Sequence, residues 1–284
     1  MSPFAPIDPI LEKGYNVRLL ADDFEGLINA WRARSEKFRS TANSSLNCQY
    51  DEGEKNKLDL FRSGKPNAPL YVFVHGGYWQ GGDKDFYSFI AEPFVKSGID
   101  VAIIGYQLCP ESSMTGIVNQ IRTALIWLWK NSRDYAISKD RINVSGHSAG
   151  GHITGMVLTT DWQQISSDLP KNLVKTGIPI SGLYQLEPLR KTSIAEALGL
   201  DDAETMALSP HFLEPITTAP ILVILGEAET PAFHWQTDQF IEKWKLNEAL
   251  VEYHSEPGAD HFEVIERLAK EDTQIFDRIK RWIL

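Results

Sequence analysis

The sequence predicts an α/β fold in which a mostly parallel central sheet carries helices on both faces. Short apolar runs bounded by turn residues alternate with stretches of helical periodicity, which is the order of βαβ units. Runs such as "YVFV" and "ILVIL" are continuously apolar, as expected of strands that are buried on both sides. The chain has no internal repeat and no low-complexity linker, so we expect a single domain over residues 1–284.

The elements are expected in the following order. A helix at about residues 22–39 has apolar side chains on one face, and "KLDLF" (57–61) alternates like an antiparallel strand. Further strands are predicted at residues 69–77, 100–106, 141–146, 176–182, 219–227 and 249–256. Helices are predicted at residues 84–97, 114–132, 149–159, 235–247 and 262–283. Residues 183–214 break this alternation, and we expect them to form a small helical lid or insertion over the sheet edge.

Composition excludes several classes of function. The formal charge of −10 argues against a nucleic-acid or anionic-membrane partner, which would favour a basic face. The N-terminal residues lack a basic region followed by an apolar stretch, and no run approaches the ~18 apolar residues of a membrane span. Cys48 and Cys109 show no metal-binding spacing, so we expect two buried reduced thiols. A cytoplasmic protein is the default expectation.

The stretch "VSGHSAGGHI" (144–153) holds the strongest motif. Its residues Gly146 to Gly150 fit G-x-S-x-G, the sharp strand-to-helix turn that exposes the hydroxyl of Ser148. A Gly/Ser-rich turn that merely joins a strand to a helix is the alternative reading of the motif taken alone. The rest of the chain decides between the two.

Polar residues lie at or after the ends of four predicted strands. "HGGYW" (75–79) lies at the end of the strand at 69–77, and Ser148 follows the strand at 141–146. "GEAET" (226–230) lies at the end of the strand at 219–227, and His261 follows the strand at 249–256. The carboxyl ends of parallel strands meet at one edge of a sheet, where such sites are built. We call "HGGYW" (75–79) the donor loop, because its backbone N–H groups can donate hydrogen bonds to a substrate. The order donor loop, serine, carboxylate, histidine along the chain is that of a serine hydrolase. Spacing alone leaves open whether Glu227 or Glu229 is the acid.

Each residue type suits a role in acyl transfer. A serine hydroxyl needs a base, which His261 can supply, and a carboxylate fixes the tautomer of that imidazole. Backbone N–H groups of Gly76, Gly77 and Ala149 could stabilise an oxyanion. The remaining side chains near these motifs have plainer readings. His75 is expected to be structural, and His147 and His152 are expected to have packing or solvent roles, whereas Tyr78 and Trp79 are expected to form a pocket wall.

With these motifs in place, the chain resembles the α/β-hydrolase superfamily, in its hormone-sensitive-lipase-like branch. Within that branch it is most similar to the kynurenine formamidase (arylformamidase) group. The segments that carry this likeness are "HGGYWQGGDKDFYSF", "GHSAGGHI", "SGLYQLEPL", "ILVILGEAETPAFHWQT" and "GADHFEVIERL". The resemblance implies Ser148 as nucleophile, His261 as base and Glu229 as acid, where many relatives have Asp. It implies no metal or organic cofactor.

The expected function is hydrolysis of small acyl groups through an acyl-enzyme. The resemblance implies N-formyl aryl amides, with N-formylkynurenine leading, and hence a role in tryptophan catabolism. Alternatives are a short-acyl carboxylesterase, another aryl-amide or carbamate hydrolase, and a non-catalytic binding protein on the same fold. A binding protein would be expected to lose the serine or the histidine, which this chain keeps. The expected partner is a small acyl substrate, and the apolar N-terminal helix is a weak sign of a homodimer.

Overall fold

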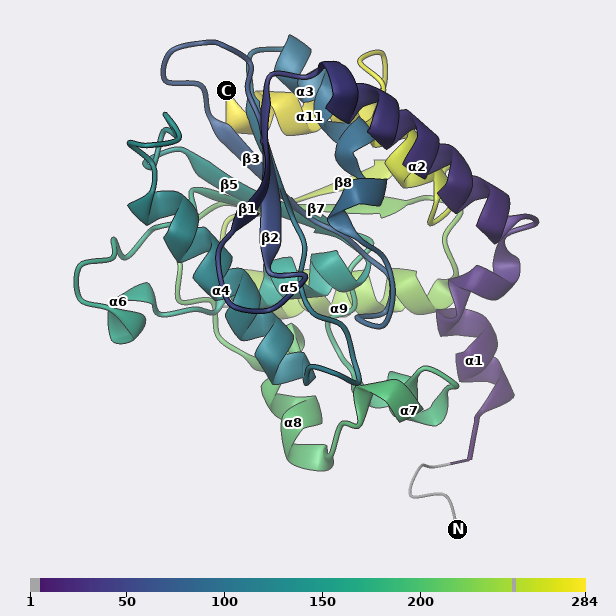
Figure 1. Ribbon diagram of the computed structural model, residues 1–284. Coiled ribbons are helices and arrows are strands. Elements are labelled where there is room, and N and C mark those ends of the chain that lie inside the picture. Colours follow the sequence, from purple (N-terminus) through teal and green to yellow (C-terminus); the bar gives the residue numbers. More distant parts are fainter. Residues whose placement is uncertain (1–5, 247–248) are drawn as a thin grey trace.

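The computed structural model describes residues 6–246 and 249–284. Its centre is an eight-stranded sheet (Figure 1). The strands are β1 (Ser44–Gln49), β2 (Lys57–Phe61), β3 (Leu70–Val74), β4 (Asp100–Ile104), β5 (Ile142–His147), β6 (Thr176–Ile180), β7 (Ile221–Gly226) and β8 (Val251–Glu256). Their order is β1-β2-β4-β3-β5-β6-β7-β8, with β3 to β8 parallel and β1 and β2 antiparallel at one edge. The predicted fold class is confirmed.

Helices cover both faces of the sheet (Figure 1). Each face has its own apolar core. One face is covered by α4 (Met114–Lys130), α5 (Ala149–Leu158) and α9 (Pro231–Leu246). The other is covered by α2 (Phe24–Thr41), α3 (Ala91–Lys96), α10 (Glu263–Leu268) and α11 (Gln274–Ile283). Cys48 and Cys109 are buried and free, as predicted, and no described helix is long and apolar enough to cross a membrane.

Two predicted helices are interrupted in the structure. Residues 84–90 form the 3₁₀ turns η2 (Lys84–Phe86) and η3 (Ser88–Ile90), and only α3 is an α-helix. The helix predicted at 262–283 divides into α10 and α11. Between them the Thr273 hydroxyl contacts the carbonyl oxygens of Arg267, at 2.7 Å, and Lys270, and the first of these contacts satisfies a carbonyl group in the last turn of α10. The predicted helix end at residue 247 lies outside the described residues.

Helix α1 (Pro9–Tyr15), strand β1, helix α6 (Trp162–Ile165) and the 3₁₀ turn η1 (Val17–Leu20) were not predicted. Helix α1 is capped by Asp8, whose carboxylate accepts from the backbone N–H groups of Ile10 at 2.8 Å and Leu11 at 3.2 Å. The Asp-Pro pair at its start is a signal for a helix N-terminus that the periodicity did not use. Strand β1 gave no alternating pattern, because its pairing with β2 shifts register between Ser45 and Cys48.

Residues 183–214 form a helical excursion, as expected. It contains η4 (Glu187–Lys191), α7 (Ala195–Leu198), α8 (Asp202–Ala207) and η5 (Pro210–Phe212). The excursion packs against α1 through η4 and against α9 through η5. The Asp8 backbone N–H donates to the Lys191 carbonyl oxygen at 2.8 Å, which ties the N-terminal segment to the excursion. A further short helix, α6 (Trp162–Ile165), follows α5.

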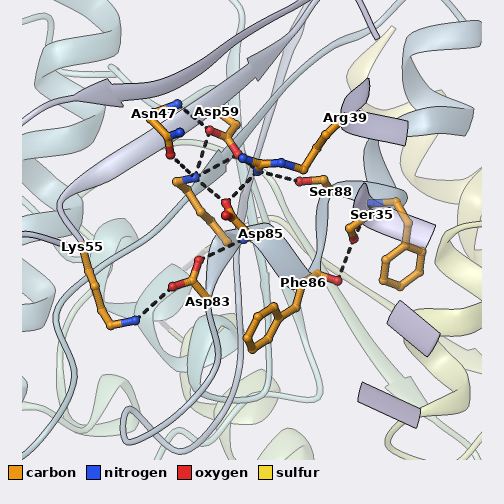
Figure 2. Close-up of polar contacts among 11 residues, drawn as sticks. Ser35, Arg39, Asn47, Lys55, Asp59, Asp83, Asp85, Phe86 and Ser88 are labelled. Carbon is orange, nitrogen blue, oxygen red and sulfur yellow. Dashed lines mark hydrogen bonds and ion pairs between the residues drawn. The ribbon is translucent and has the colours of Figure 1, made fainter. Parts of the chain in front are cut away.

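A buried charge network joins α2, the β1–β2 hairpin and the segment after β3 (Figure 2). The carboxylate of Asp59 is fully buried and pairs with both Arg39 and Lys84. Lys84 Nζ lies 3.0 Å from Asp59 Oδ1 and donates to Asn47 Oδ1 at 2.7 Å. Asp85 pairs with the same two cations, so the network has two positive and two negative charges. It therefore braces the chain just beyond "HGGYW".

Replacing Asp59 with alanine is expected to lower the free energy of unfolding by about 3–5 kcal/mol, because it leaves Arg39 and Lys84 without their buried partner. The measurement is urea denaturation of the purified protein. Glu92→Ala is the control, since the Glu92–Lys96 pair is exposed and its loss should cost about 1 kcal/mol or less. Equal, small losses in both variants would contradict a structural role for the network.

Candidate active site

The loops that carry the predicted site meet at one edge of the sheet. Val74, at the end of β3, pairs with Gly146 of β5, and His147 pairs with Ile180 at the end of β6. β7 and β8 end together, where Gly226 pairs with Glu256. Because these strands are parallel, the residues that follow each of them lie on the same side of the molecule.

Ser148 stands at a strained turn between β5 and α5. Its backbone has φ 56° and ψ −115°, a conformation that a residue with a Cβ rarely adopts. The flanking glycines are required by space: a Cβ on Gly146 would lie 2.3 Å from the Gly150 carbonyl oxygen, and a Cβ on Gly150 would lie 2.0 Å from the Val74 carbonyl oxygen. The Ser148 N–H donates to the Ile180 carbonyl oxygen at 2.9 Å, which anchors the turn to β6.

His261 and Glu229 form a buried pair. His261 Nδ1 lies 2.7 Å from Glu229 Oε2, and neither side chain is more than 6% exposed. A carboxylate at Nδ1 favours the tautomer with the proton on that nitrogen, which leaves Nε2 free to accept another. Glu227 lies elsewhere: it is exposed, and its carboxylate accepts from the Gly258 N–H at 2.7 Å. The structure thus places Glu229, and not Glu227, against the imidazole.

Glu229 is itself held by two donors. Its Oε1 atom accepts from the Gly226 N–H at 3.1 Å and from the Ser181 hydroxyl. Ser181 follows β6 with φ 51°, so it stands at the same sheet edge as the other site residues. Sequence analysis gave Ser181 no role, although a polar residue directly after a buried strand was the signal that found the others. Ser181 is a positioning residue for the carboxylate.

His147 positions the loop that carries His261. Its Nε2 donates to the His261 carbonyl oxygen at 2.9 Å, and the two ring centroids are 4.5 Å apart. Burial holds the pKa of His147 well below its ordinary value, so the ring is neutral and can keep this N–H. The packing role expected for His147 therefore includes a hydrogen bond that the sequence pattern did not predict.

The donor loop lies directly against the serine turn. A Cβ on Gly76 would lie 2.9 Å from the His147 carbonyl oxygen and 3.1 Å from Ser148 Cβ. Gly77 has φ 120°, and a Cβ there would lie 2.2 Å from the Gly81 carbonyl oxygen. Ala149 begins α5, where backbone N–H groups have no partner within the helix. The three predicted donors are thus close to Ser148 in the fold.

His75 is structural, as expected. Its Nδ1 contacts the Gly76 carbonyl oxygen at 2.8 Å, and its ring stacks on Tyr106 with the centroids 4.2 Å apart. Burial lowers the pKa of His75 to about 4, so the ring is neutral near pH 7. The stack and the hydrogen bond hold the start of the donor loop.

The two predicted wall aromatics have different positions. Tyr78 lines the cavity that contains Ser148 and His261, whereas Trp79 does not. Trp79 is fully buried in the core and meets the His152 ring edge-on at 4.9 Å. The prediction for Trp79 is therefore wrong. Tyr78 and Trp79 both have positive φ, and in this turn the Tyr78 ring lines the cavity while the Trp79 ring packs in the core.

The cavity is small, with a volume of about 30 Å³. That is room for one or two water-sized groups. No residue of 183–214 lines it, so the expectation of a lid from that excursion is corrected. Part of the wall around Ser148 and His261 comes from the N-terminal part of the chain, namely Val17, Arg18, Phe24, Ile28 and Trp31.

Hydrogen bonds to the donor loop hold this N-terminal wall in place. The Tyr78 hydroxyl donates to the Tyr15 carbonyl oxygen and accepts from the Val17 N–H at 3.0 Å. Arg18 donates to the Gly77 carbonyl oxygen at 3.0 Å. In the described part of the chain, no three or more His, Cys, Asp or Glu side chains gather as ligands for a metal ion.

Comparisons with known proteins agree with this geometry. The BD-FAE family matches residues 58–236. A kynurenine formamidase from Salmo salar is 31% identical over 90% of this chain and 87% of its own length. The crystal structure of a candidate thioesterase from Silicibacter sp. TM1040 has a TM-score of 0.83 and 31% identity, covering 96% of this chain and 98% of that one. Esterase B from Lactobacillus rhamnosis shares the fold, with a TM-score of 0.70 at 16% identity over 92% of this chain and 96% of that one.

These matches extend over most of the chain, and the BD-FAE match includes Gly76, Ser148 and Glu229. Formamidase and esterase relatives are hydrolases that share this architecture, and the resemblance found in the sequence is confirmed. The chain belongs to the BD-FAE family of the α/β-hydrolase superfamily and is a homologue of the kynurenine formamidases.

Proposed function

We propose that the protein is a serine hydrolase that removes small acyl groups through an acyl-enzyme. The observation that carries this proposal is the buried contact of 2.7 Å between His261 Nδ1 and Glu229 Oε2, in a site whose cavity also contains Ser148. A histidine oriented in this way has its second ring nitrogen available for a serine hydroxyl.

The proposed reaction has two steps. In the first, Ser148 Oγ attacks the acyl carbon while His261 Nε2 takes the hydroxyl proton and then delivers it to the leaving amine or alcohol. In the second, His261 activates a water that attacks the acyl-enzyme, and the proton returns to Ser148. Glu229 stabilises the imidazolium in both steps. The N–H groups of Gly76, Gly77 and Ala149 stabilise the oxyanion.

The proposed substrates are N-formyl aryl amides, with N-formylkynurenine as the first candidate and tryptophan catabolism as the setting. The support is twofold. The relative from Salmo salar is named as a kynurenine formamidase. A cavity of about 30 Å³ beside Ser148 suits a formyl or acetyl group better than a long acyl chain. Aromatic side chains of Phe24, Tyr78 and Phe262 border the same cavity, and an aryl leaving group, which is too large for its volume, would pack against them at its solvent side.

A short-acyl carboxylesterase or another aryl-amide or carbamate hydrolase is the second candidate, because the same residues would cleave those bonds. The relatives named as a candidate thioesterase and an esterase favour it. A non-catalytic binding protein is disfavoured by the buried His261–Glu229 pair, since binding alone needs no oriented base.

A hydrolysis panel tests the substrate class. We expect turnover of N-formylkynurenine and N-formylanthranilate, and a fall in kcat/KM of about tenfold or more from p-nitrophenyl butyrate to the octanoate. The reason is the small volume beside Ser148. Activity that rises towards octanoyl esters would favour an open esterase pocket, and esters cleaved without any formamide would select the second candidate.

A further inference from the structure

We propose that Arg18 selects substrates whose leaving group carries a carboxylate, such as N-acylated aminobenzoates. The inference deepens the proposed function and rests on it, because Arg18 lines the cavity that contains Ser148 and His261. It answers a question that the catalytic residues leave open, namely what binds the charged part of an amino-acid-like or aminobenzoate-like leaving group.

The charge of the cavity wall points to an anionic ligand. Among the described residues that line this cavity, Arg18 is the only Lys or Arg, and none is Asp or Glu. His147 is neutral because burial lowers its pKa. The whole chain has a formal charge of −10, so its long-range field does not attract anions. A single cation inside a largely apolar cavity would provide the local attraction that an anionic substrate needs.

The guanidinium of Arg18 is held without a carboxylate partner. Its Nη2 atom donates to the Gly77 carbonyl oxygen at 3.0 Å, and its Cζ atom lies 4.9 Å from the centroid of the Tyr78 ring. The Phe24 ring lies on another side, at 6.0 Å. No Asp or Glu in the described part of the chain lies within ion-pair distance of Arg18. Its other N–H donors can therefore bind a ligand carboxylate in the bidentate manner that guanidinium favours.

The position of Arg18 fits the leaving-group side of the reaction. It bonds to Gly77, which belongs to the donor loop, so its guanidinium lies beside the place proposed for the scissile carbonyl. Arg18 is partly exposed, whereas Ser148 and His261 are buried, so Arg18 lies on the solvent side of the cavity. A small acyl group can occupy the cavity of about 30 Å³ beside Ser148. The aryl ring and its carboxylate are too large for that volume and would lie at the solvent side of the cavity, next to Arg18.

The test compares two substrates that differ only in this charge. N-formylanthranilate carries a carboxylate, and N-formyl-2-aminobenzamide carries a neutral amide at the same position. We expect Arg18→Gln to lower the ratio of kcat/KM for N-formylanthranilate to that for the benzamide by about 10- to 100-fold, mainly through the KM of the anthranilate, because loss of the Gly77 contact affects both substrates alike. Arg18→Lys should retain part of the preference, because it keeps the charge and loses the bidentate geometry.

Arg32→Gln is the matched control. Arg32 is exposed on α2, lies over the Phe86 ring at 4.1 Å and does not line the cavity. Both substrates should be cleaved by this variant as by the wild type. If Arg18→Gln reduces turnover of both substrates equally, then Arg18 serves only to hold the donor loop through Gly77, and the inference is wrong. Unchanged kinetics with both substrates would overturn it as well.

A binding measurement separates this inference from the proposed function. Calorimetry on Ser148→Ala, with and without Arg18→Gln, compares anthranilate with 2-aminobenzamide and needs no turnover. If the wild type cleaves no formamide, the proposed substrate class fails, yet tighter binding of anthranilate that is lost with Arg18 would still support the inference. Equal affinity for the two ligands would overturn the inference, even in an active formamidase.

Discussion

Replacing Ser148 with alanine is expected to lower kcat by about 10⁶, the loss found when the nucleophile of such a triad is removed. Only the Oγ atom is deleted. Alanine keeps the Cβ, so the strain of the turn at φ 56° is unchanged, and the fold should be retained. Steady-state turnover of the preferred panel substrate is the measurement, with the urea midpoint as the control for folding. Residual turnover equal to that of the wild type, in protein free of host esterases, would contradict the proposed mechanism.

Replacing Glu229 with glutamine is expected to lower kcat by about 10⁴, the loss expected when a triad acid becomes an amide. An amide can turn its NH₂ group towards His261 Nδ1, which favours the wrong tautomer. The size and the remaining polar contacts of the side chain are nearly unchanged, so folding should not suffer. The loss should appear in kcat for every acyl substrate, since the imidazolium forms with each of them.

Glu227→Gln is the matched control for this prediction. Glu227 lies two residues away, is exposed and accepts from the Gly258 N–H rather than contacting His261. Its replacement should change kcat by less than about tenfold. If the large loss followed Glu227 instead, the acid would have to be reassigned. Equal, small losses would mean that neither carboxylate orients the imidazole.

Much of the fold was predictable because strands buried on both faces leave continuous apolar runs in the sequence. The runs that become β3 and β7 are fully buried, and both were found. Strand β1 was missed because it lies at the sheet edge, where few side chains are buried and the sequence need not alternate between apolar and polar residues. The register shift between Ser45 and Cys48 interrupts any alternation further. Helix α1 was missed because only its first residues carry a signal, the Asp8–Pro9 start.

The site was predictable where chain order and strand ends determine it. Ser148, Glu229 and His261 follow parallel strands, so their meeting at one edge follows from topology. Trp79 was placed wrongly because its position beside the Gly76–Gly77 turn does not reveal where its side chain packs, and the ring lies in the core against His152. The N-terminal wall of the cavity was missed for another reason. It depends on long-range contacts, such as that of the Tyr78 hydroxyl with Val17, which no local pattern encodes.

The central claim is that Ser148 is an activated nucleophile, and labelling with a fluorophosphonate probe tests it most directly. Such probes react with a serine whose hydroxyl is activated by a neighbouring base. Intact mass and peptide mapping of the labelled protein should show one adduct per chain, on Ser148, and Ser148→Ala should remain unlabelled. A wild-type protein that stays unlabelled, or an adduct that persists in Ser148→Ala, would contradict the account.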